Sequence, residues 1–293
     1  MAEGAGVGAR AGAWRVRALG VLYHPRMPSA RALAQEVRAW AEARGCTAPI
    51  APNDADGPAA LAGWLEGLDL LVTLGGDGSI LRAVRAAAPC GTPLLGVNLG
   101  RVGFLTETDP DGWQAVLERV LAGEGWIEER MMLREVARRG PERLSEADAL
   151  NDVVVGRGAR ARVVQLVTRV DGGELATYVA DGLIVATATG STAYALAAGG
   201  PVLPPQLRNI LLVPVAPHLS MERPVVLAQG VSVQITVVGE RPAVLTVDGE
   251  VRAELEGGDE VTVGASPHVA RFLRVQDPAY FYRTLLARLV PRS

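Results

Sequence analysis

Three glycines surround a single carboxylate at Gly75-Gly76-Asp77-Gly78, directly after the apolar run from Leu70 to Leu74. Ser79 follows, and apolar residues then recur with the spacing of one helix face. The pattern predicts a strand, a glycine turn and a helix, which together aim backbone N–H groups at an anion. Glycine suits such a turn because it permits positive φ angles and lets a ligand come close to the backbone. Asp77 would repel a phosphate there unless it contacts a metal ion or accepts a proton; the alternative is that it only caps the helix.

Two stretches in the second half of the chain also carry chemically useful side chains. Asn151-Asp152 places an amide and a carboxylate before the apolar run Val153–Val155, where an Asx turn is the structural alternative. Four hydroxyls lie between Thr187 and Thr192, shortly before Tyr194. Helix capping accounts for one or two of these hydroxyls, so the remainder indicate the wall of a polar pocket.

The sequence contains no lysine, so all 29 basic residues are arginine. This excludes a Walker A loop, a Schiff-base lysine and a lysine of the protein-kinase type. Phosphate chemistry in this chain would therefore depend on backbone N–H groups, hydroxyls, arginine and metal ions.

Composition places the chain among globular proteins. At 293 residues it can form two domains, and it is 49% hydrophobic and 21% charged with a formal net charge of −3. The absence of a basic block and a pI near 5.8 argue against nucleic acid as a partner. No apolar run approaches the ~18 residues of a membrane span, so no membrane partner is predicted. Residues 1–14 are rich in Gly and Ala without an apolar centre, and we expect a loose tail.

The cysteines and histidines give few signals of their own. Cys46 and Cys90 lack C-x-x-C spacing, which fits a reducing cytoplasm. His218 lies in a Pro-rich loop, where it is either functional or an ordinary surface histidine. His24 and His268 lie beside prolines and are assigned no role.

Strand and helix patterns alternate in the first part of the chain. The expected elements are strands at 16–23, 70–74 and 94–98 and helices at 29–44, 58–65, 79–88 and 110–122. Residues 46–57 are expected to form a loop, and Asp109-Pro110 to start the last of these helices. The alternation predicts a mostly parallel sheet with ligands at the carboxyl ends of its strands.

The pattern changes near Gly125 to short β runs separated by Gly, Asp and Pro turns. Strands are expected at 127–138, 149–155, 163–170, 174–179, 182–187, 209–214, 231–238, 243–248 and 259–264, with a helix near 191–198 and a last helix from Asp277-Pro278. The predicted organisation is a tail (1–14), an α/β domain (15–125), a β-rich domain (126–276) and a C-terminal helix (277–293).

In their order along the chain these motifs resemble those of the NAD kinase family, ATP-dependent enzymes that phosphorylate the adenosine 2′-hydroxyl of NAD. The resemblance covers roughly residues 70–250, and the run Thr189–Tyr194 is its most specific part. Gly75–Gly78 alone is weak, since phosphofructokinases and lipid kinases carry similar turns. The other matching elements are Gly96-Val97-Asn98, Gly100, Gly103-Phe104-Leu105, Asn151-Asp152, Asp181-Gly182, Gly199-Gly200-Pro201, Pro217-His218 and Asp248-Gly249.

The resemblance implies a Rossmann-like α/β domain, a β-rich, β-sandwich-like domain and a C-terminal helix that packs back on the first domain. It also implies an active site between the domains, and often between the subunits of a homodimer or homotetramer. The implied substrates are NAD and ATP, and whether polyphosphate can replace ATP is left open. The implied cofactor is Mg²⁺ or another divalent cation, held mainly by the nucleotide phosphates.

Asp77 matches the family's catalytic aspartate, which is proposed to accept the proton of the 2′-hydroxyl. NAD binding is expected at Asp77, Gly78, Arg82, Asn151, Asp152, Arg162, Asp181, Thr192, Ala193, Tyr194, Ala195, Leu196 and Ala197. The ATP phosphates are expected at Gly75, Gly76, Gly78, Asn98, Thr189, Gly190 and Ser191.

The chain departs from the family pattern at two positions in these motifs. Asp152 stands where glutamate is usual, and we expect the same hydrogen bonds from the shorter side chain. Ala188 replaces a usual proline, which loosens the expected turn. The hypothesis is therefore an NAD kinase; the alternatives are a kinase of the same fold with another acceptor, or a nucleotide-binding regulator without catalysis.

Overall fold

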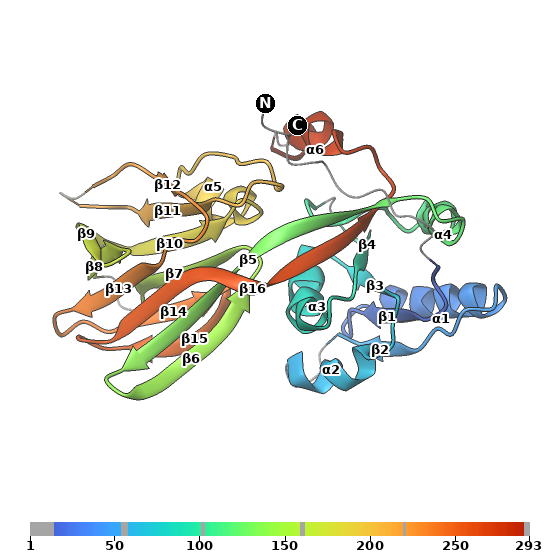
Figure 1. Cartoon of the computed structure of the whole chain (residues 1–293), viewed down its shortest axis with the longest axis horizontal. Helices are drawn as coiled ribbons and strands as arrows, with labels where there is room; N and C mark the ends of the chain where they lie inside the picture. The colour runs from blue at the N-terminus through green and yellow to red at the C-terminus, as the bar shows by residue number, and fades with distance from the viewer. Residues whose placement is uncertain (1–14, 54–57, 101–102, 159–161, 219–220, 290–293) are drawn as a thin grey trace, which may run out of the picture. The chain divides into compact units, whose positions relative to one another are not determined.

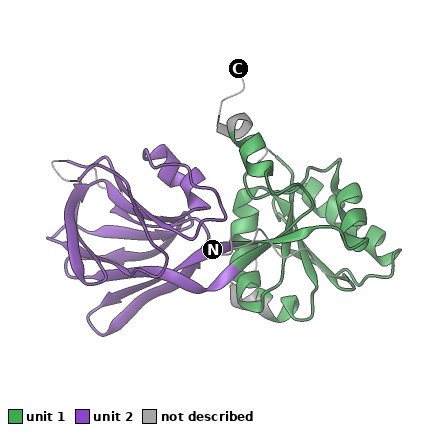
Figure 2. Ribbon diagram, turned by 45° about the horizontal axis from the view of Figure 1, so that its top comes forward, with its two compact units in different colours: residues 1–129, 270–293 green, residues 130–269 purple. Residues whose placement is uncertain are grey.

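The structure, a computed structural model, describes residues 15–53, 58–100, 103–158, 162–218 and 221–289. The chain forms two compact units, one of residues 1–129 and 270–293 and the other of residues 130–269 (Figure 2). It passes from one unit to the other inside the long strands β5 (Trp126–Arg139) and β16 (Glu260–Arg274) (Figure 1). The domain boundaries expected after residues 125 and 276 differ from these positions, because a continuous strand leaves no turn signal where a unit ends. The expected tail lies outside the described residues.

The first unit is built on parallel strands. β1 (Leu19–Tyr23), β2 (Ile50–Pro52), β3 (Leu70–Gly75) and β4 (Leu94–Asn98) follow the order β2-β1-β3-β4. All three pairings are parallel, and the end of β16 continues the sheet through Phe272, which pairs with Leu94. Every residue of β3 and β4 is buried, which explains their uninterrupted apolar sequence.

The described residues of this unit form the helices α1 (Pro28–Glu42), α2 (Pro58–Leu65), α3 (Asp77–Cys90), α4 (Trp113–Leu121) and α6 (Tyr280–Leu289). The apolar faces of α1 and α4 pack on the sheet, with Val37 and Leu117 fully buried in the same core as Leu70. The C-terminal helix α6 belongs to this unit as expected, and its Tyr280 hydroxyl donates to Glu128 at 3.3 Å.

Two expectations for this unit are wrong. The predicted loop at 46–57 contains β2, which is only three residues long and carries no run of β-branched residues. The helix predicted from residue 110 begins at Trp113, because the Asp109 carboxylate first closes a turn by accepting the N–H groups of Asp111 and Gly112.

The second unit is a β-sandwich-like pair of sheets. Its other strands are β6 (Glu142–Ala149), β7 (Asp152–Arg157), β8 (Val164–Val170), β9 (Gly173–Ala180), β10 (Gly182–Thr187), β11 (Ile210–Val215), β12 (Val225–Leu227), β13 (Val233–Val238), β14 (Ala243–Val247) and β15 (Glu250–Leu255). One sheet has the antiparallel order β12-β11-β10-β7-β14-β15, and the other contains β16, β13, β8 and β9, with β5 paired to both β6 and β16. Inward-facing residues of both sheets, among them Leu166, Val185 and Leu245, form one buried core.

Three strands of this unit, β6, β12 and β15, were not predicted. Their sequences are polar or short: β6 is half charged and mostly exposed or half-buried, and β12 has only three residues. The helix predicted near 191–198 is a 3₁₀ turn at Gly190–Thr192 followed by the single turn α5 (Tyr194–Ala197). The backbone of Ala193, with φ −100° and ψ −130°, separates the two.

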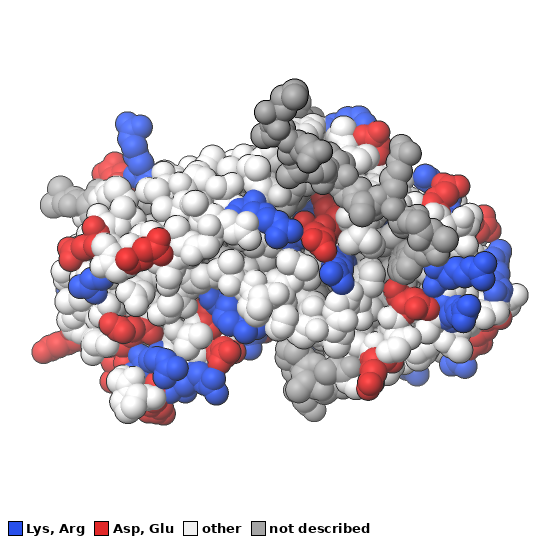
Figure 3. All heavy atoms as spheres, viewed as in Figure 1, with Lys and Arg blue, Asp and Glu red and all other residues white. Residues whose placement is uncertain are grey.

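The surface carries charges of both signs. Over the described residues of the face shown in Figure 3, acidic and arginine side chains occur in small mixed groups. Of the helices in the described part of the chain, none has the length and apolar character needed to cross a bilayer.

Candidate active site

Asp77 is the first residue of α3 and its carboxylate does not cap the helix. The side chain instead reaches the loop that follows β4. Its Oδ2 accepts the N–H of Phe104 at 2.9 Å, and its Oδ1 accepts the N–H of Leu105 at 3.3 Å. These two amides fix the orientation of a half-buried carboxylate at the carboxyl end of β3. The structure therefore favours the interpretation of Asp77 as a positioned functional group over that of a simple cap.

One of the two reasons expected for the glycines around Asp77, a positive φ angle, does not hold. None of Gly75, Gly76 and Gly78 has a positive φ angle. A Cβ atom at Gly75 would lie 2.3 Å from Oγ of Ser79, so this position requires close packing. At Gly76 and Gly78 a Cβ would meet nothing within 4 Å, which leaves open space beside the N-terminus of α3.

Asn98 and Arg82 lie near this turn in different ways. Asn98 ends β4 opposite Gly75 in the sheet register, and its buried amide side chain bonds both the carbonyl and the N–H of Gly100. Asn98 thus supports the start of the loop that follows β4. Arg82 lies one turn along α3 from Gly78 and is exposed.

In the second unit, the Asp248 carboxylate accepts hydrogen bonds from the backbone amides at the start of β7. Asp248 lies between β14 and β15 with φ 49° and accepts the N–H groups of Leu150, Asn151 and Asp152 at 3.0, 2.7 and 3.2 Å. The backbone N–H of Asp248 in turn donates to the Asp152 carbonyl at 2.9 Å. Asn151 and Asp152 are therefore held by β14 as well as by their own strand.

Asp152 has an altered acidity. It is 5% exposed, and burial together with the charge of Asp248 raises the pKa of its carboxyl group from 3.8 to about 7. A carboxyl group that titrates near neutral pH is a common feature of functional sites.

The turn after β10 packs directly on Asn151. Thr187 donates its N–H to the Asn151 carbonyl at 2.9 Å and its hydroxyl to the Leu150 carbonyl at 2.6 Å. A Cβ at Gly190 would lie 2.0 Å from the Asn151 carbonyl oxygen, so only glycine fits there. The structure thus brings the two motifs together.

Three of the four hydroxyls, those of Thr187, Ser191 and Thr192, form hydrogen bonds with backbone groups of this turn or of neighbouring segments. Thr187 also accepts the Gly190 N–H, and the Thr192 hydroxyl donates to the Thr189 carbonyl. The hydroxyl of Ser191 is fully buried, donates to Ala188 and accepts from Leu203. Among the described residues, only the buried Thr189 hydroxyl of this set lacks a hydrogen-bond partner.

The predicted run from Thr192 to Ala197 forms the short helix α5 and its approach. Tyr194 is 48% exposed, whereas Ala195 is fully buried against β10 and β11. Thr192, Ala193 and Leu196 are half-buried, and Ala197 is exposed.

Asp181 and Arg162 do not lie with these residues. Asp181 precedes β10 and Thr187 ends it, so the two are separated by the whole six-residue strand, about 20 Å. Asp181 forms an ion pair with Arg157 at 2.9 Å, and the N–H of the exposed His218 donates to Val179 at this same end. Arg162 is exposed just before β8, whose first residue pairs with Ala180.

Several partners of the predicted residues were missed. Nothing in the type or spacing of Phe104 and Leu105 shows that their amides bind Asp77, although Gly103 next to them is a signal. A Cβ at Gly103 would lie 2.0 Å from Oδ1 of Asp77. Asp248 belongs to a matching motif, but its capture of three amides depends on strand pairing that the sequence does not display.

Within the described ranges, no three His, Cys, Asp or Glu side chains gather into a set that could hold a metal ion.

Comparison with known families gives two matches along the chain. Residues 58–125 match the ATP-NAD kinase N-terminal domain and residues 150–275 match the ATP-NAD kinase C-terminal domain. An NAD kinase of Chloroflexus aurantiacus is 41% identical over 271 residues, which are 92% of this chain and 97% of the relative. An NAD kinase of Moorella thermoacetica is 46% identical over 212 residues, covering 72% of this chain and 68% of the relative.

Solved structures with the same fold include two kinases. A yeast NADH kinase complexed with NADH superposes with a TM-score of 0.83 at 24% identity, over 95% of this chain and 89% of its own. An NAD kinase from Archaeoglobus fulgidus in complex with ATP superposes with a TM-score of 0.72 at 27% identity, over 92% of this chain and 98% of its own.

Proposed function

We propose how this chain, which belongs to the ATP-NAD kinase family, uses its residues to transfer the γ-phosphoryl group of ATP to the adenosine 2′-hydroxyl of NAD. The observation that carries the proposal is the Asp77 carboxylate, held by the Phe104 and Leu105 amides beside the N-terminus of α3.

Asp77 is the general base for the acceptor hydroxyl. Each of its oxygens accepts one backbone N–H and keeps a lone pair for a further hydrogen bond. Phosphoryl transfer passes through a loose transition state, so correct placement of one carboxylate contributes more than a strongly basic group would. The two amides supply that placement.

The donor phosphates bind beside the open backbone of Gly76 and Gly78. The open space at both glycines and the N–H groups at the start of α3 suit an anion. Arg82, exposed on the next turn of α3, provides a positive charge for the phosphates of NAD. Asn98 acts indirectly, through its bonds to Gly100.

Asn151 and Asp152 bind the nucleoside part of NAD. Asp248 and Thr187 fix the backbone of this pair, so its side chains are pre-positioned for a ligand. The exposed Tyr194 ring adds a stacking surface for NAD.

Asp181 and Arg162 act from a second copy of the chain in a homodimer or homotetramer. They lie at the opposite end of β10 and β7 from Asn151, so one copy of this unit does not place them on the same ligand. Contribution from a second copy reconciles their position with the role that the family resemblance implies.

Mg²⁺ accompanies ATP and is held mainly by the nucleotide phosphates, as is usual for this ion. When bound, it supplies the positive charge that neutralises the transferring phosphoryl group. We place the reaction in the cytoplasm, where the free thiols of Cys46 and Cys90 would stay reduced.

NADP formation by the purified protein with NAD, ATP and MgCl₂, followed with an NADP-specific dehydrogenase, tests the proposal. We expect turnover that stops with EDTA, returns with excess Mg²⁺ and is absent with an NAD analogue that lacks the adenosine 2′-hydroxyl. NAD binding without turnover would indicate a regulator, and turnover of the deoxy analogue would contradict the acceptor.

Gly103→Ala tests whether the Phe104 and Leu105 amides must hold Asp77 in place. The new Cβ would overlap the carboxylate and force the side chain from its amides, and misplacement by ~1 Å can cost ~100-fold in rate. We expect kcat to fall by that order while the fold is retained, since the clash is with a movable side chain. Gly100→Ala is the matched control, because a Cβ there meets nothing within 4 Å. Equal kcat in the two variants would refute the need for these hydrogen bonds to Asp77.

The raised pKa of Asp152 predicts opposite effects of pH on binding and on stability. As the pH falls through about 7, the carboxylate becomes protonated and we expect calorimetry to show weaker NAD binding. The folded state takes up this proton well above the unfolded pKa of about 3.9, so acidification from pH 8 to 5 stabilises the unit through this group.

Asp152→Asn should remove both effects, because the amide does not titrate. A pH dependence of NAD affinity that persists in this variant would exclude Asp152 as its origin.

A further inference from the structure

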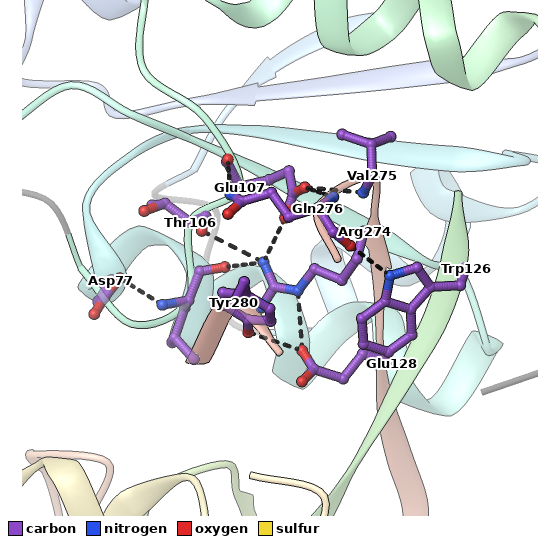
Figure 4. Close-up of polar contacts among 10 residues, drawn as sticks. Asp77, Thr106, Glu107, Trp126, Glu128, Arg274, Val275, Gln276 and Tyr280 are labelled. Atoms are coloured by element: carbon purple, nitrogen blue, oxygen red, sulfur yellow. Dashed lines mark hydrogen bonds and ion pairs between the residues drawn. The ribbon is translucent and has the colours of Figure 1, made fainter. Parts of the chain in front are cut away.

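A cluster of charged side chains is buried in the first unit, next to the loop whose amides bind Asp77. Arg274, Glu107 and Glu128 are 0%, 5% and 1% exposed, and they come from β16, the loop after β4, and β5 (Figure 4). Arg274 donates from Nε to Glu128 at 2.9 Å and from Nη1 to Glu107 at 3.2 Å. No step of the phosphoryl transfer described above uses these residues.

The cluster is tied to the end of β16 and to α6. One oxygen of Glu107 accepts the N–H groups of Val275 and Gln276, each at 2.9 Å. Tyr280, the first residue of α6, donates to Glu128. Burial alone would lower the pKa of Arg274, but Tyr280, Glu128 and Glu107 raise it above its ordinary value, so the guanidinium remains charged.

One residue, Leu105, links the cluster to Asp77. Arg274 Nη1 also donates to the Leu105 carbonyl at 3.1 Å, and it lies 3.4 Å from that of Thr106. The Leu105 N–H donates to Asp77 (Figure 4). Leu105 is therefore held from both sides, by Arg274 at its carbonyl and by Asp77 at its amide.

We propose that Arg274, fixed by Glu107 and Glu128, is a positioning residue that holds the 104–106 backbone so that its amides keep Asp77 oriented for catalysis. A buried ion pair is rarely the most stable filling for a core, because desolvation offsets most of the attraction. However, an arginine guanidinium carries several N–H donors in a rigid planar arrangement, so it fixes the positions of several acceptors at once. This inference rests on the proposed role of Asp77.

Arg274→Lys is the main test. Lysine keeps the charge but replaces the spread donors with a single nitrogen, which cannot reproduce the bonds to Glu128, Glu107 and Leu105 together. We expect kcat to fall roughly 10- to 100-fold, with KM for NAD and ATP within about twofold of wild type. Hydrogen exchange should become faster in peptides that contain residues 104–106 and stay unchanged in β3.

Arg139→Lys is the matched control. Arg139 forms a bidentate pair with the buried Asp259, at 2.9 and 2.8 Å, in the other unit and without a link to Asp77. Arg139→Lys should lower the thermal midpoint without changing kcat, which separates the loss of a bidentate pair to a buried carboxylate from the loss of positioning.

An Asp77→Asn background shows whether Arg274 acts through Asp77. There, Arg274→Lys should cost less than about twofold in kcat, because the group it positions is already gone. The same factor in both backgrounds, or wild-type kcat in folded Arg274→Lys, would overturn the inference. If Asp77→Asn alone keeps wild-type kcat, the base assignment fails instead.

Glu107→Gln provides a second variant in case Arg274→Lys does not fold. The amide keeps the shape and one acceptor oxygen but removes the charge, and we expect a several-fold loss of kcat that disappears in the Asp77→Asn background. A folded Glu107→Gln with unchanged kcat and unchanged exchange at 104–106 would contradict the role of the cluster.

Discussion

The carboxylate of Asp77 can be held by the amides of Phe104 and Leu105 only because β3 and β4 are neighbours in a parallel sheet. Parallel strands point their carboxyl ends the same way, so the loops that follow them meet at one edge. In this chain Gly75 and Asn98 are paired at that edge, and residues separated by more than twenty positions become hydrogen-bond partners. The lack of a Cβ at Gly103 leaves the room that this contact needs.

The second unit uses the same kind of interaction on an antiparallel scaffold. Asp248 accepts three consecutive amides at the entrance of β7, as Asp77 accepts two at the end of β4. In both places a carboxylate orders a loop by satisfying backbone donors that would otherwise need water. The two places differ in what lies next to the carboxylate. Asp248 has the buried Asp152 beside it, and the burial of Asp152 together with the negative charge of Asp248 raises the pKa of Asp152 to about 7.

Much of the fold follows from local sequence. The buried run of β3 and the glycines after it predict the strand, the turn and α3, since fully buried parallel strands have continuous apolar sequences. Short or polar strands such as β2, β6 and β12 were missed because their pairing, not their composition, defines them.

At the candidate site, the sequence names residues but does not show which of them are in contact. Asn151 and Gly190 meet, but the hydroxyl of Ser191 is buried in its own turn and Asp181 lies at the far end of β10. Arg274 gave no signal at all, because it is a single arginine within a strand and acts through tertiary contacts. Periodicity and motif spacing report which residues are present, whereas strand register decides which of them meet.

The kcat of Asp77→Asn, measured beside that of Asp69→Asn, tests the central role of Asp77 most directly. The Asp69 carboxylate also accepts two backbone amides, those of Arg17 and Ala18, but it precedes β3 whereas Asp77 follows that strand. We expect Asp77→Asn to lose on the order of 10²–10⁴-fold in kcat with little change in KM for NAD, while Asp69→Asn keeps its turnover. Near-normal turnover in Asp77→Asn, or an equal loss in both variants, would contradict Asp77 as the base.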